Sequence, residues 1–399
     1  MKLIQREYYL NKLISIIGTP DIKIITGVRR SGKSRLMDQF ETYLLNHFDD
    51  ANILKINFNE TKNKYLRNAE ALEEYALKSV EDGKNNFLLI DEIQRCEGFE
   101  DAINSLYETG KYDIYLTGSN AFLSSSDLAT LFVGRKYEIE VYPFSLSEYM
   151  RYYEIDDAEK AFDLYFREGG MAGAYLYEAE EDKYNYINEI YETLIIRDIK
   201  QKYNIRNKAM LDQLTDYMLD NVSNLASAKN VSDNLISKKI KTNDKTIGNY
   251  MSYICRSFLF YRVRRYDLKG KKYLESNDKY YVCDPIFRYA RLGTVNMDYG
   301  RMYENMVAIE LLRRGYEVYV GKLYRKEIDF VAKKRDEVIY IQVSDNIGDE
   351  KTFGREVESL LQIKNAYPKL LIARTHHPEY QYEGIRIIDL AEWLCKSNI

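Results

Sequence analysis

Short apolar runs alternate with helical patterns over the first 150 of the 399 residues. This alternation is typical of a parallel sheet built from β-α-β units, because strands that are buried on both faces are apolar throughout. We expect helices at 33–46 and 69–82, among others. The strands are expected at 22–26, 52–58, 86–91, 112–118 and 136–142.

The pattern changes after this region. Residues 146–202 are predicted to be almost entirely helical, with one interruption at "EGGMAG". Between 211 and 268 three helical segments are followed by an aromatic and β-branched hairpin pattern, "LFYRVRRYDLKGKKYLES…KYYVCD". Three helices followed by a hairpin is the order of a winged helix-turn-helix.

The last hundred residues return to a mixed α/β pattern. Helices are expected at 301–314 and 353–365, and strands near 316–320, 327–332, 338–344, 369–374 and 385–389. With only 5 Pro in the chain, linkers are short and the domains are expected to pack against each other. The predicted domains are an α/β core at 1–145, a helical region at 146–204, a winged helix at 205–290 and an α/β domain at 291–399.

The motif "GVRRSGKS" at 27–34 fits GxxxxGK[ST] and stands between a predicted strand and a predicted helix. Its two glycines let successive backbone N–H groups point at phosphate oxygens, and the helix adds its positive end. Lys33 would reach the β and γ phosphates, and the Ser34 hydroxyl would bind Mg²⁺. The expected nucleotide contacts are Gly27, Val28, Arg29, Arg30, Ser31, Gly32, Lys33, Ser34 and Arg35.

An acidic pair ends the predicted strand "NFLLIDEIQ". Asp91 would hold Mg²⁺ through a bound water, and Glu92 would orient and deprotonate the attacking water. Adjacent acids after a phosphate loop are typical of ATPases with a catalytic glutamate, and differ from the pattern of kinases and GTPases. The expected ligands are therefore ATP and Mg²⁺, and Lys33 and Glu92 are the expected catalytic residues.

Two further polar sites follow. In "LTGSN", Asn120 is the first choice for a contact with the γ-phosphate or the water, and Ser119 the second; a simple turn is the alternative. In "LFVGR", Arg135 offers a cation for the transition-state phosphate, in its own chain or in a neighbouring subunit of a homo-oligomer. A surface arginine without such a role is the alternative.

Taken together, "GVRRSGKS", "LLIDEIQ", "LTGSN", "LFVGR", "PFSLSEY" and "REGGMAGAYL" resemble the AAA-type ATPases of bacteria and archaea whose C-terminal domain is similar to restriction-endonuclease cores. The resemblance covers essentially the whole chain. It implies a five-stranded core of order 5-1-4-3-2, a helical lid and a winged helix, and it implies adenine as the base. Gly169 and Gly170 match the double glycine of the lid, whereas Ala172 stands where relatives often have Pro.

Residues 205–272 form a basic region, with 14 Lys and Arg against 6 Asp and a local net charge of +8. A first helix at 231–237 is followed by a lysine-rich turn, and Asp244 is expected to cap a recognition helix that ends near 256. DNA is the partner that this charge favours, and a packing or subunit-contact role is the alternative. The expected DNA contacts are Lys241, Lys245, Asn249, Arg262, Arg264 and Arg265.

The segment "EIDFVAKKRDEVIYIQVS" resembles the metal site of restriction-endonuclease cores, where an Asp and a Glu-x-Lys on neighbouring strands meet a helical Glu. The matching positions are Glu304, Asp329, Gln342 and Ser344. Ser344 lacks the positive charge of the usual lysine, so we expect a degenerate site without nuclease activity. Lys333 on the neighbouring strand is the alternative source of that charge.

The net charge of −4 says nothing about partners by itself. The N-terminus lacks a signal-peptide pattern, no apolar run approaches a membrane span, and the four Cys are far apart, which favours a cytoplasmic protein. We therefore expect an ATPase coupled to DNA binding or remodelling. The alternatives are a slow ATP-controlled switch that scaffolds a protein partner and, less favoured, an ATP-licensed nuclease.

Overall fold

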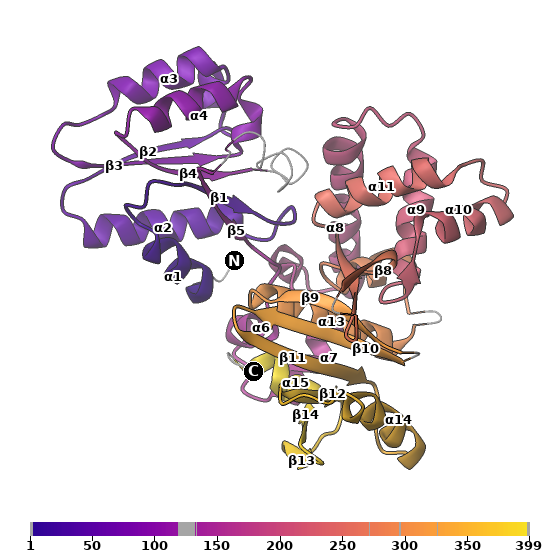
Figure 1. The fold of residues 1–399 in the computed structure, drawn as a ribbon. Helices are drawn as coiled ribbons and strands as arrows, with labels where there is room; N and C mark the ends of the chain where they lie inside the picture. Colours follow the sequence, from indigo (N-terminus) through magenta and orange to yellow (C-terminus); the bar gives the residue numbers. More distant parts are fainter. Residues whose placement is uncertain are drawn as a thin grey trace. The chain divides into compact units, whose positions relative to one another are not determined.

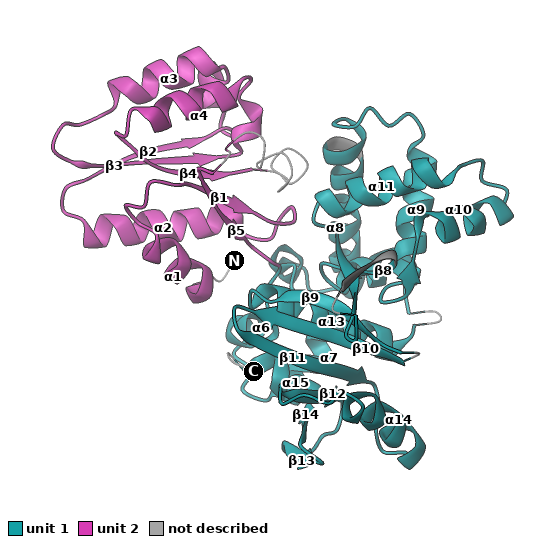
Figure 2. Ribbon diagram, viewed as in Figure 1, with its two compact units in different colours: residues 1, 143–399 teal, residues 2–142 magenta. Residues whose placement is uncertain are grey.

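The computed structural model describes residues 3–118, 132, 134–270, 272–294, 297–324 and 326–396. The chain divides into two compact units, which Figure 2 shows in different colours. The N-terminal unit comprises residues 2–142, and the C-terminal unit comprises residues 143–399 together with residue 1.

The N-terminal unit is built on a five-stranded sheet in the order β2-β3-β4-β1-β5, in which all neighbouring strands are parallel. This result confirms the predicted order 5-1-4-3-2. Because the strands run in the same direction, their carboxyl ends meet at one edge of the sheet. The strands are β1 Ile22–Thr26, β2 Ala51–Asn57, β3 Asn85–Asp91, β4 Asp113–Thr117 and β5 Lys136–Glu140.

Helices cover both faces of this sheet (Figure 1). α1 (Glu7–Ser15) and α2 (Lys33–His47) pack on one face, and α3 (Ala69–Lys78) and α4 (Phe99–Glu108) pack on the other. All five residues of β1 are buried, as expected for the centre of a covered parallel sheet. Short 3₁₀ turns, η1 Thr61–Leu66 and η2 Ile93–Arg95, lie between these elements.

The C-terminal unit begins with a helical region. A capping box between Ser145 and Glu148 starts its first helix, which agrees with the motif "PFSLSEY". The described elements are α6 Leu146–Tyr153, α7 Ala158–Glu168, the 3₁₀ turn η3 Ala172–Leu176, α8 Glu180–Thr193 and the π-helix η4 Leu194–Lys200.

The double glycine interrupts this helical region for a steric reason. Gly169 has a φ of 64°, and a Cβ on Gly170 would lie 2.2 Å from the backbone oxygen of Phe144. The Gly170 amide donates to the buried Asp284 carboxylate at 2.6 Å. Burial raises the pKa of Asp284 to about 7, although its backbone hydrogen bonds oppose that shift.

A helical group with a hairpin follows: α9 (Lys208–Asp220), β6 (Leu225–Ala226), α10 (Ala228–Ser237), α11 (Asp244–Arg256), β7 (Phe260–Asp267) and β8 (Lys272–Val282). β8 pairs antiparallel with both β6 and β7. The expected cap of α11 was wrong by one residue. The Asn243 side chain accepts from the Thr246 amide, whereas Asp244 is the first helical residue.

The hairpin continues into the last part of the chain as one sheet. Among the described residues its order is β13-β14-β12-β11-β10-β9-β7-β8-β6, and β7 pairs in parallel with β9. The sheet therefore crosses the position at 290/291 where a domain boundary was expected. The remaining elements are α12 Ile286–Leu292, α13 Tyr299–Arg313, β9 Glu317–Leu323, β10 Lys326–Lys334, β11 Glu337–Ser344, α14 Glu350–Leu361, β12 Lys369–Ala373, β13 Tyr380–Tyr382, β14 Ile385–Asp389 and α15 Leu390–Cys395.

Candidate functional site

The "GVRRSGKS" loop leaves β1 at the carboxyl edge of the parallel sheet and leads into α2. Gly27 and Gly32 have φ values of 128° and 100°, a region that favours glycine. A Cβ on Gly27 would lie 2.1 Å from the backbone oxygen of Val141, so the loop can pass the end of β5 only with glycine at this position. The sequence thus forms a tight turn whose centre is lined by backbone.

The Lys33 side chain folds back into this turn. Its exposure is 7%, and its ammonium donates to the carbonyl oxygens of Gly27 at 2.8 Å and Val28 at 3.0 Å. Both of these acceptors are neutral backbone groups. A phosphate oxygen that carries a full negative charge would form a stronger hydrogen bond with the same ammonium.

Asp91 stands at the end of β3, opposite the loop. Its Oδ1 accepts from the Ser34 hydroxyl at 3.1 Å and from the Thr117 hydroxyl. Burial raises the pKa of Asp91, and the two hydroxyl hydrogen bonds and the Lys33 charge oppose that rise. The structure therefore brings together Lys33, Ser34 and Asp91, as the sequence predicts.

Thr117, at the end of β4, is a candidate site residue that the sequence interpretation missed, since its hydroxyl contacts both Asp91 and the Glu92 amide. It stands in the motif "LTGSN", where Asn120 and Ser119 were preferred; both of those residues lie outside the described part of the chain. Thr117 could have been found from its position, since it is the last residue of the strand next to β1 and its hydroxyl lies at the carboxyl edge.

Glu92 follows Asp91 in a left-handed conformation with a φ of 60°. Its amide donates to the Thr117 hydroxyl at 3.2 Å, and its carboxylate accepts from the Gln94 side-chain amide at 2.6 Å. Gln94 was also missed, although it stands two residues after the acid pair in "DEIQ". The acid that would act on water is thus held from its backbone and from its side chain.

Arg135 lies away from this group. The Ile22 amide at the start of β1 donates to the Arg135 carbonyl at 2.7 Å, so Arg135 stands at the amino edge of the sheet, and its side chain pairs with Glu108 at 2.5 Å. The loop begins after Thr26 at the opposite edge, about 16 Å along a five-residue strand. The structure does not bring Arg135 to the phosphate loop of its own chain, and a role in a neighbouring subunit stays a prediction.

These residues fit a magnesium-bound nucleotide. The loop can pass Val141 only with glycine at position 27, and the Lys33 ammonium folds back onto the loop carbonyls. Ser34 and Asp91 together offer oxygen donors of the kind that Mg²⁺ prefers.

Comparison with known proteins agrees with this geometry. An uncharacterized protein of Haemophilus influenzae is 36% identical over 400 residues, which cover 99% of each chain. The chain belongs to the family of this protein. Residues 19–150 match the family model described as an AAA domain, and residues 159–298 match a domain of unknown function (DUF8612). The N-terminal unit is therefore an AAA-type P-loop domain.

More distant matches were also found. The uncharacterized protein MJ1544 of Methanocaldococcus jannaschii is 28% identical over 83% of this chain and 76% of its own. Among solved structures, the Walker-type ATPase PABY2304 of Pyrococcus abyssi matches with a TM-score of 0.44 and 15% identity, over 72% of this chain and 96% of its own. The Aeropyrum pernix ORC1 protein, solved in complex with DNA, matches with a TM-score of 0.30 and 11% identity, over 77% and 93%. No helix formed by the described residues is both long and apolar enough to cross a membrane.

The C-terminal unit contains a second cluster of charged residues, which includes the predicted nuclease-like positions. The ammonium of Lys279, on β8, lies 2.9 Å from the Glu304 carboxylate, 2.7 Å from that of Glu327 and 3.8 Å from that of Asp329. The Tyr281 hydroxyl also donates to Glu304, at 2.6 Å. Glu304 and Asp329 are thus brought together as predicted, but with a lysine that the sequence interpretation missed.

Burial and charge oppose each other in this Lys279 cluster. Burial would lower the pKa of Lys279, but Glu304, Asp329 and Glu327 outweigh it and raise that pKa. Burial raises the pKa of Glu304, which Lys279 opposes. Burial and the Glu304 charge raise the pKa of Asp329 well above its ordinary value, against Lys279 and the Val343 amide. The ammonium is the counter-ion of the cluster.

The other nuclease-like positions make weaker contacts. The Gln342 side-chain oxygen accepts from the Asp329 amide at 3.4 Å, and the Ser344 hydroxyl donates to a backbone carbonyl of the next loop at 3.1 Å. Lys333, the expected alternative cation, lies 3.7 Å from the ring centre of Tyr266. The positive charge near Asp329 therefore comes from Lys279, which no local motif could have indicated because it is fifty residues away in sequence.

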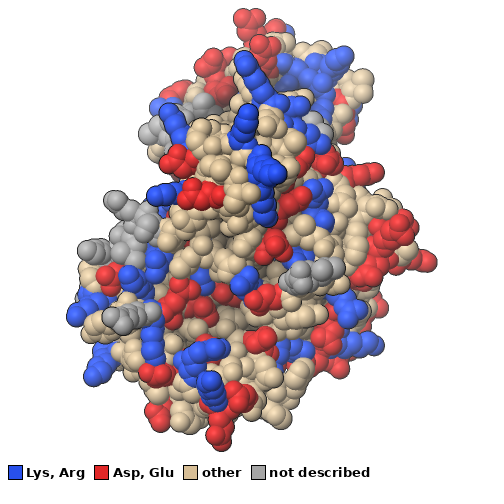
Figure 3. All heavy atoms as spheres, turned by 90° about the vertical axis from the view of Figure 1, so that its right-hand side faces the viewer, with Lys and Arg blue, Asp and Glu red and all other residues tan. Residues whose placement is uncertain are grey.

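The predicted DNA contacts on α11 are exposed. Lys245, Asn249 and Ser252 repeat at intervals of four and three residues, so they line one face of the helix, and Lys241 is exposed in the preceding turn. Figure 3 shows the molecule from the right-hand side of Figure 1, where α10 lies. Several Lys and Arg side chains are visible in the upper part of this view. The opposite face of α11 packs inward through Ile247, Met251 and Ile254.

The three predicted arginines of β7 differ in their surroundings. Arg262 is paired with Asp278 at 2.5 Å, so its charge is partly neutralised within the protein. Arg264 is exposed, and Arg265 is half-buried. Among the three, Arg264 is therefore the one most open to a phosphate.

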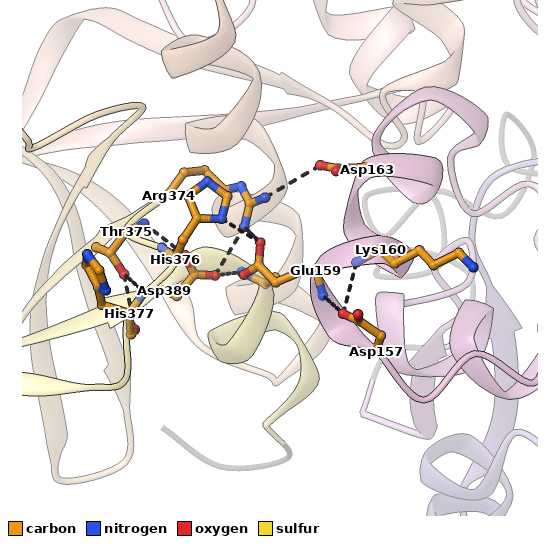
Figure 4. A network of polar contacts seen from close by, with 10 residues as sticks. Asp157, Glu159, Lys160, Asp163, Arg374, Thr375, His376, His377 and Asp389 are labelled. Carbon is orange, nitrogen blue, oxygen red and sulfur yellow. Dashed lines mark hydrogen bonds and ion pairs between the residues drawn. The ribbon is translucent and has the colours of Figure 1, made fainter.

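A further polar network joins α7 to the ends of β12 and β14 (Figure 4). Glu159, His376 and Asp389 offer oxygen and nitrogen atoms within 4.8 Å of one another. The Arg374 guanidinium pairs with Glu159 at 2.7 Å, Asp389 at 3.3 Å and Asp163 at 3.5 Å. Since a guanidinium already neutralises these carboxylates, we interpret the network as a structural clamp and not as a metal site.

Proposed function

We propose that this protein hydrolyses ATP in a magnesium-dependent reaction at the phosphate loop of its AAA domain. One observation carries the proposal: the Lys33 ammonium lies inside a glycine-shaped backbone cradle, and Asp91 and Glu92 stand across from it at the same sheet edge.

Each residue would have a separate role. Lys33 would leave the two loop carbonyls and bind phosphate oxygens, and the loop amides would bind others. Ser34 and Asp91 would hold Mg²⁺, which would supply neutralisation of the phosphate charge. Glu92 would take a proton from the attacking water while Thr117 and Gln94 hold it in place.

The experiment is a measurement of phosphate release from ATP by the full chain with and without Mg²⁺. Turnover is expected with Mg²⁺ and should be lost in Lys33→Ala. Glu92→Gln should bind ATP but turn it over at least about 100-fold more slowly. If the wild-type chain showed no affinity for ATP in the presence of Mg²⁺, the proposal would be wrong. Tight binding with very slow turnover would favour the alternative, a nucleotide-controlled switch for a protein partner.

We further propose that double-stranded DNA is the partner through which turnover is used, with the exposed face of α11 as its contact. Lys241, Lys245 and Asn249 are exposed there, within a region of net charge +8. The element order from α9 to β8 is that of a winged helix. DNA should raise the ATPase rate, and Lys245→Ala should lower the salt dependence of DNA affinity by about one unit of slope.

The control for DNA binding is Lys84→Ala, because Lys84 is an exposed lysine of the AAA domain that pairs with Glu81. It should leave DNA affinity unchanged. Equal affinity of the Lys245→Ala and wild-type chains at every salt concentration would remove α11 from the proposal. Nuclease activity is not proposed, because Lys279 is held by carboxylates and Ser344 lacks a charge.

A further inference from the structure

Arg6 lies under the phosphate loop, although it is outside the loop motif. It immediately precedes α1, and its exposure is 3%. One guanidinium nitrogen, Nη1, donates to the carbonyl oxygens of Ser31 and Tyr142, both at 2.9 Å. The guanidinium also lies 4.6 Å from the ring centre of Tyr9. A buried charge thus joins the phosphate loop to the segment that follows β5.

The position of Arg6 is fixed from its own side of the contact. Its amide donates to the Gln39 side chain at 3.2 Å, and Gln39 in turn donates to the Ile4 carbonyl at 2.8 Å. Gln39 belongs to α2, the helix that the phosphate loop opens. The segment that carries Arg6 is therefore anchored to the same helix as Lys33, and the guanidinium has little freedom to move away from the loop.

The hydrogen bond from Arg6 to the Ser31 carbonyl fixes the orientation of the peptide group between Ser31 and Gly32. In a trans peptide the C=O and the following N–H point in opposite directions. Since Arg6 holds the Ser31 carbonyl on its own side, the Gly32 amide is turned to the other side, away from the guanidinium. In a phosphate loop the amides that face the centre bind phosphate oxygens.

The contact with Tyr142 lies where the chain changes units. Tyr142 is the last residue of the N-terminal unit, and Pro143 is the first of the long segment of the C-terminal unit. The Pro143 carbonyl is held by Arg313 at 3.1 Å, and the Phe144 amide donates to Gly170 at 2.8 Å. Consecutive carbonyls are therefore held by arginines of different units, Arg6 before the crossover and Arg313 after it.

We propose that Arg6 is a positioning residue of the ATP site, which turns the Gly32 amide toward the phosphates and joins the loop to the crossover at residues 142–144. ATP binding would then slow the hydrogen exchange of the backbone amides in this crossover segment. This inference rests on the proposed ATP-binding function. It adds a residue that does not touch the nucleotide and a route by which nucleotide binding reaches the second unit.

The test uses the full-length variants Arg6→Gln and Arg6→Lys. The matched control is Lys23→Met, which removes another buried cation of the same unit. Lys23 lies on strand β1, near the edge opposite the loop, and its ammonium pairs with Asp113 of β4 at 2.5 Å. MgATP affinity is measured by equilibrium binding. Arg6→Gln should bind MgATP about 10- to 100-fold more weakly than wild type, since a charged hydrogen bond is lost, whereas Lys23→Met should differ by less than about threefold.

A second measurement separates positioning from general stability. Hydrogen exchange of the peptide that contains residues 142–145 is compared with and without saturating MgATP. The wild-type chain and Lys23→Met should show ATP-dependent protection, and Arg6→Gln should show none even when ATP is bound. Arg6→Lys, which keeps the charge but lacks the planar guanidinium, should lie between them.

The outcomes are distinct. If the wild-type chain bound no ATP, the proposed function itself would fail. If it bound ATP but Arg6→Gln bound equally well and showed the same ATP-dependent protection, only the role of Arg6 would be overturned. If Arg6→Gln did not fold, wild-type ATP affinity and wild-type ATP-dependent protection in Arg6→Lys would overturn the role of Arg6. If MgATP did not change the hydrogen exchange of residues 142–145 in the wild-type chain, the proposed link between the phosphate loop and the crossover would be rejected.

Discussion

Two buried lysines in this protein have opposite surroundings. Lys33 in the AAA domain and Lys279 in the C-terminal unit have exposures of 7% and 4%. The Lys33 ammonium donates to the carbonyl oxygens of Gly27 and Val28, whereas the Lys279 ammonium lies within 4 Å of three carboxylates. Backbone dipoles therefore contribute to the surroundings of Lys33, whereas three carboxylates surround Lys279.

This difference separates a site that can exchange ligands from one that is closed. A phosphate can replace a backbone carbonyl at Lys33, because the incoming anion interacts more strongly with an ammonium than a dipole does. At Lys279 a new anion would have to displace carboxylates and would meet their negative charge. A buried lysine is therefore a sign of ligand binding only when its present partners are weaker than the expected ligand.

The largest effect is expected at the acid opposite Lys33. Glu92→Gln keeps the shape of the side chain but cannot accept a proton, so kcat should fall about 100- to 10,000-fold while ATP affinity changes little. Steady-state phosphate release and equilibrium ATP binding measure the two quantities. The control is Glu97→Gln, the same change at an exposed position five residues later. Unchanged turnover in Glu92→Gln would contradict the assignment.

The next effect concerns stability and the other lysine. Lys279→Met leaves buried carboxylates without their counter-ion, so the free energy of unfolding should fall by about 3 to 5 kcal/mol. Hydrogen exchange of α13 measures this loss. Lys326→Met, which removes a half-exposed pair with Glu358, should cost at most about 1 kcal/mol. Equal stability of the two variants would show that the Lys279 cluster does not support the fold.

The third prediction concerns the pH dependence of stability that Asp329 gives to the Lys279 cluster. Asp329 has a raised pKa in the folded state, so its stabilising contribution is complete below the unfolded pKa of about 4 and is lost as the pH rises through the folded value. Asp329→Asn should therefore become more stable relative to wild type between pH 5 and pH 8, by up to about 1.4 kcal/mol per pH unit. Urea unfolding at both pH values tests this, with exposed Asp336→Asn as the control. A constant difference would contradict it.

The smallest effect is expected at Thr117. Thr117→Val keeps the volume but removes the hydroxyl that donates to Asp91 and accepts from the Glu92 amide. One lost hydrogen bond corresponds to a decrease in kcat of about 5- to 30-fold. The control is Thr42→Val, which removes a hydroxyl that donates to the Asp38 carbonyl on α2. If kcat were the same in both variants, Thr117 would not support the acid pair.

Much of the AAA domain could be predicted because its signals are local. Most strands of the parallel sheet contain a short apolar run, and the phosphate-loop glycines and Lys33 lie within one eight-residue motif. Asp91 and Glu92 follow directly from a buried strand. In these cases the residues that act together are close in sequence, or their spacing is set by the repeat of strand and helix.

Contacts between distant segments could not be predicted in this way. Arg6 reaches carbonyls 25 and 136 positions away, and Lys279 meets Glu304, Glu327 and Asp329 because a hairpin and a later strand join one sheet. Neither composition nor periodicity indicates that Lys279 is the lysine that turns inward. Local pattern specifies strands, helices and the phosphate loop, because those depend on backbone geometry over a few residues. Which charges meet depends on how the elements pack, since a charge is satisfied by whatever partner folding brings within a few ångströms.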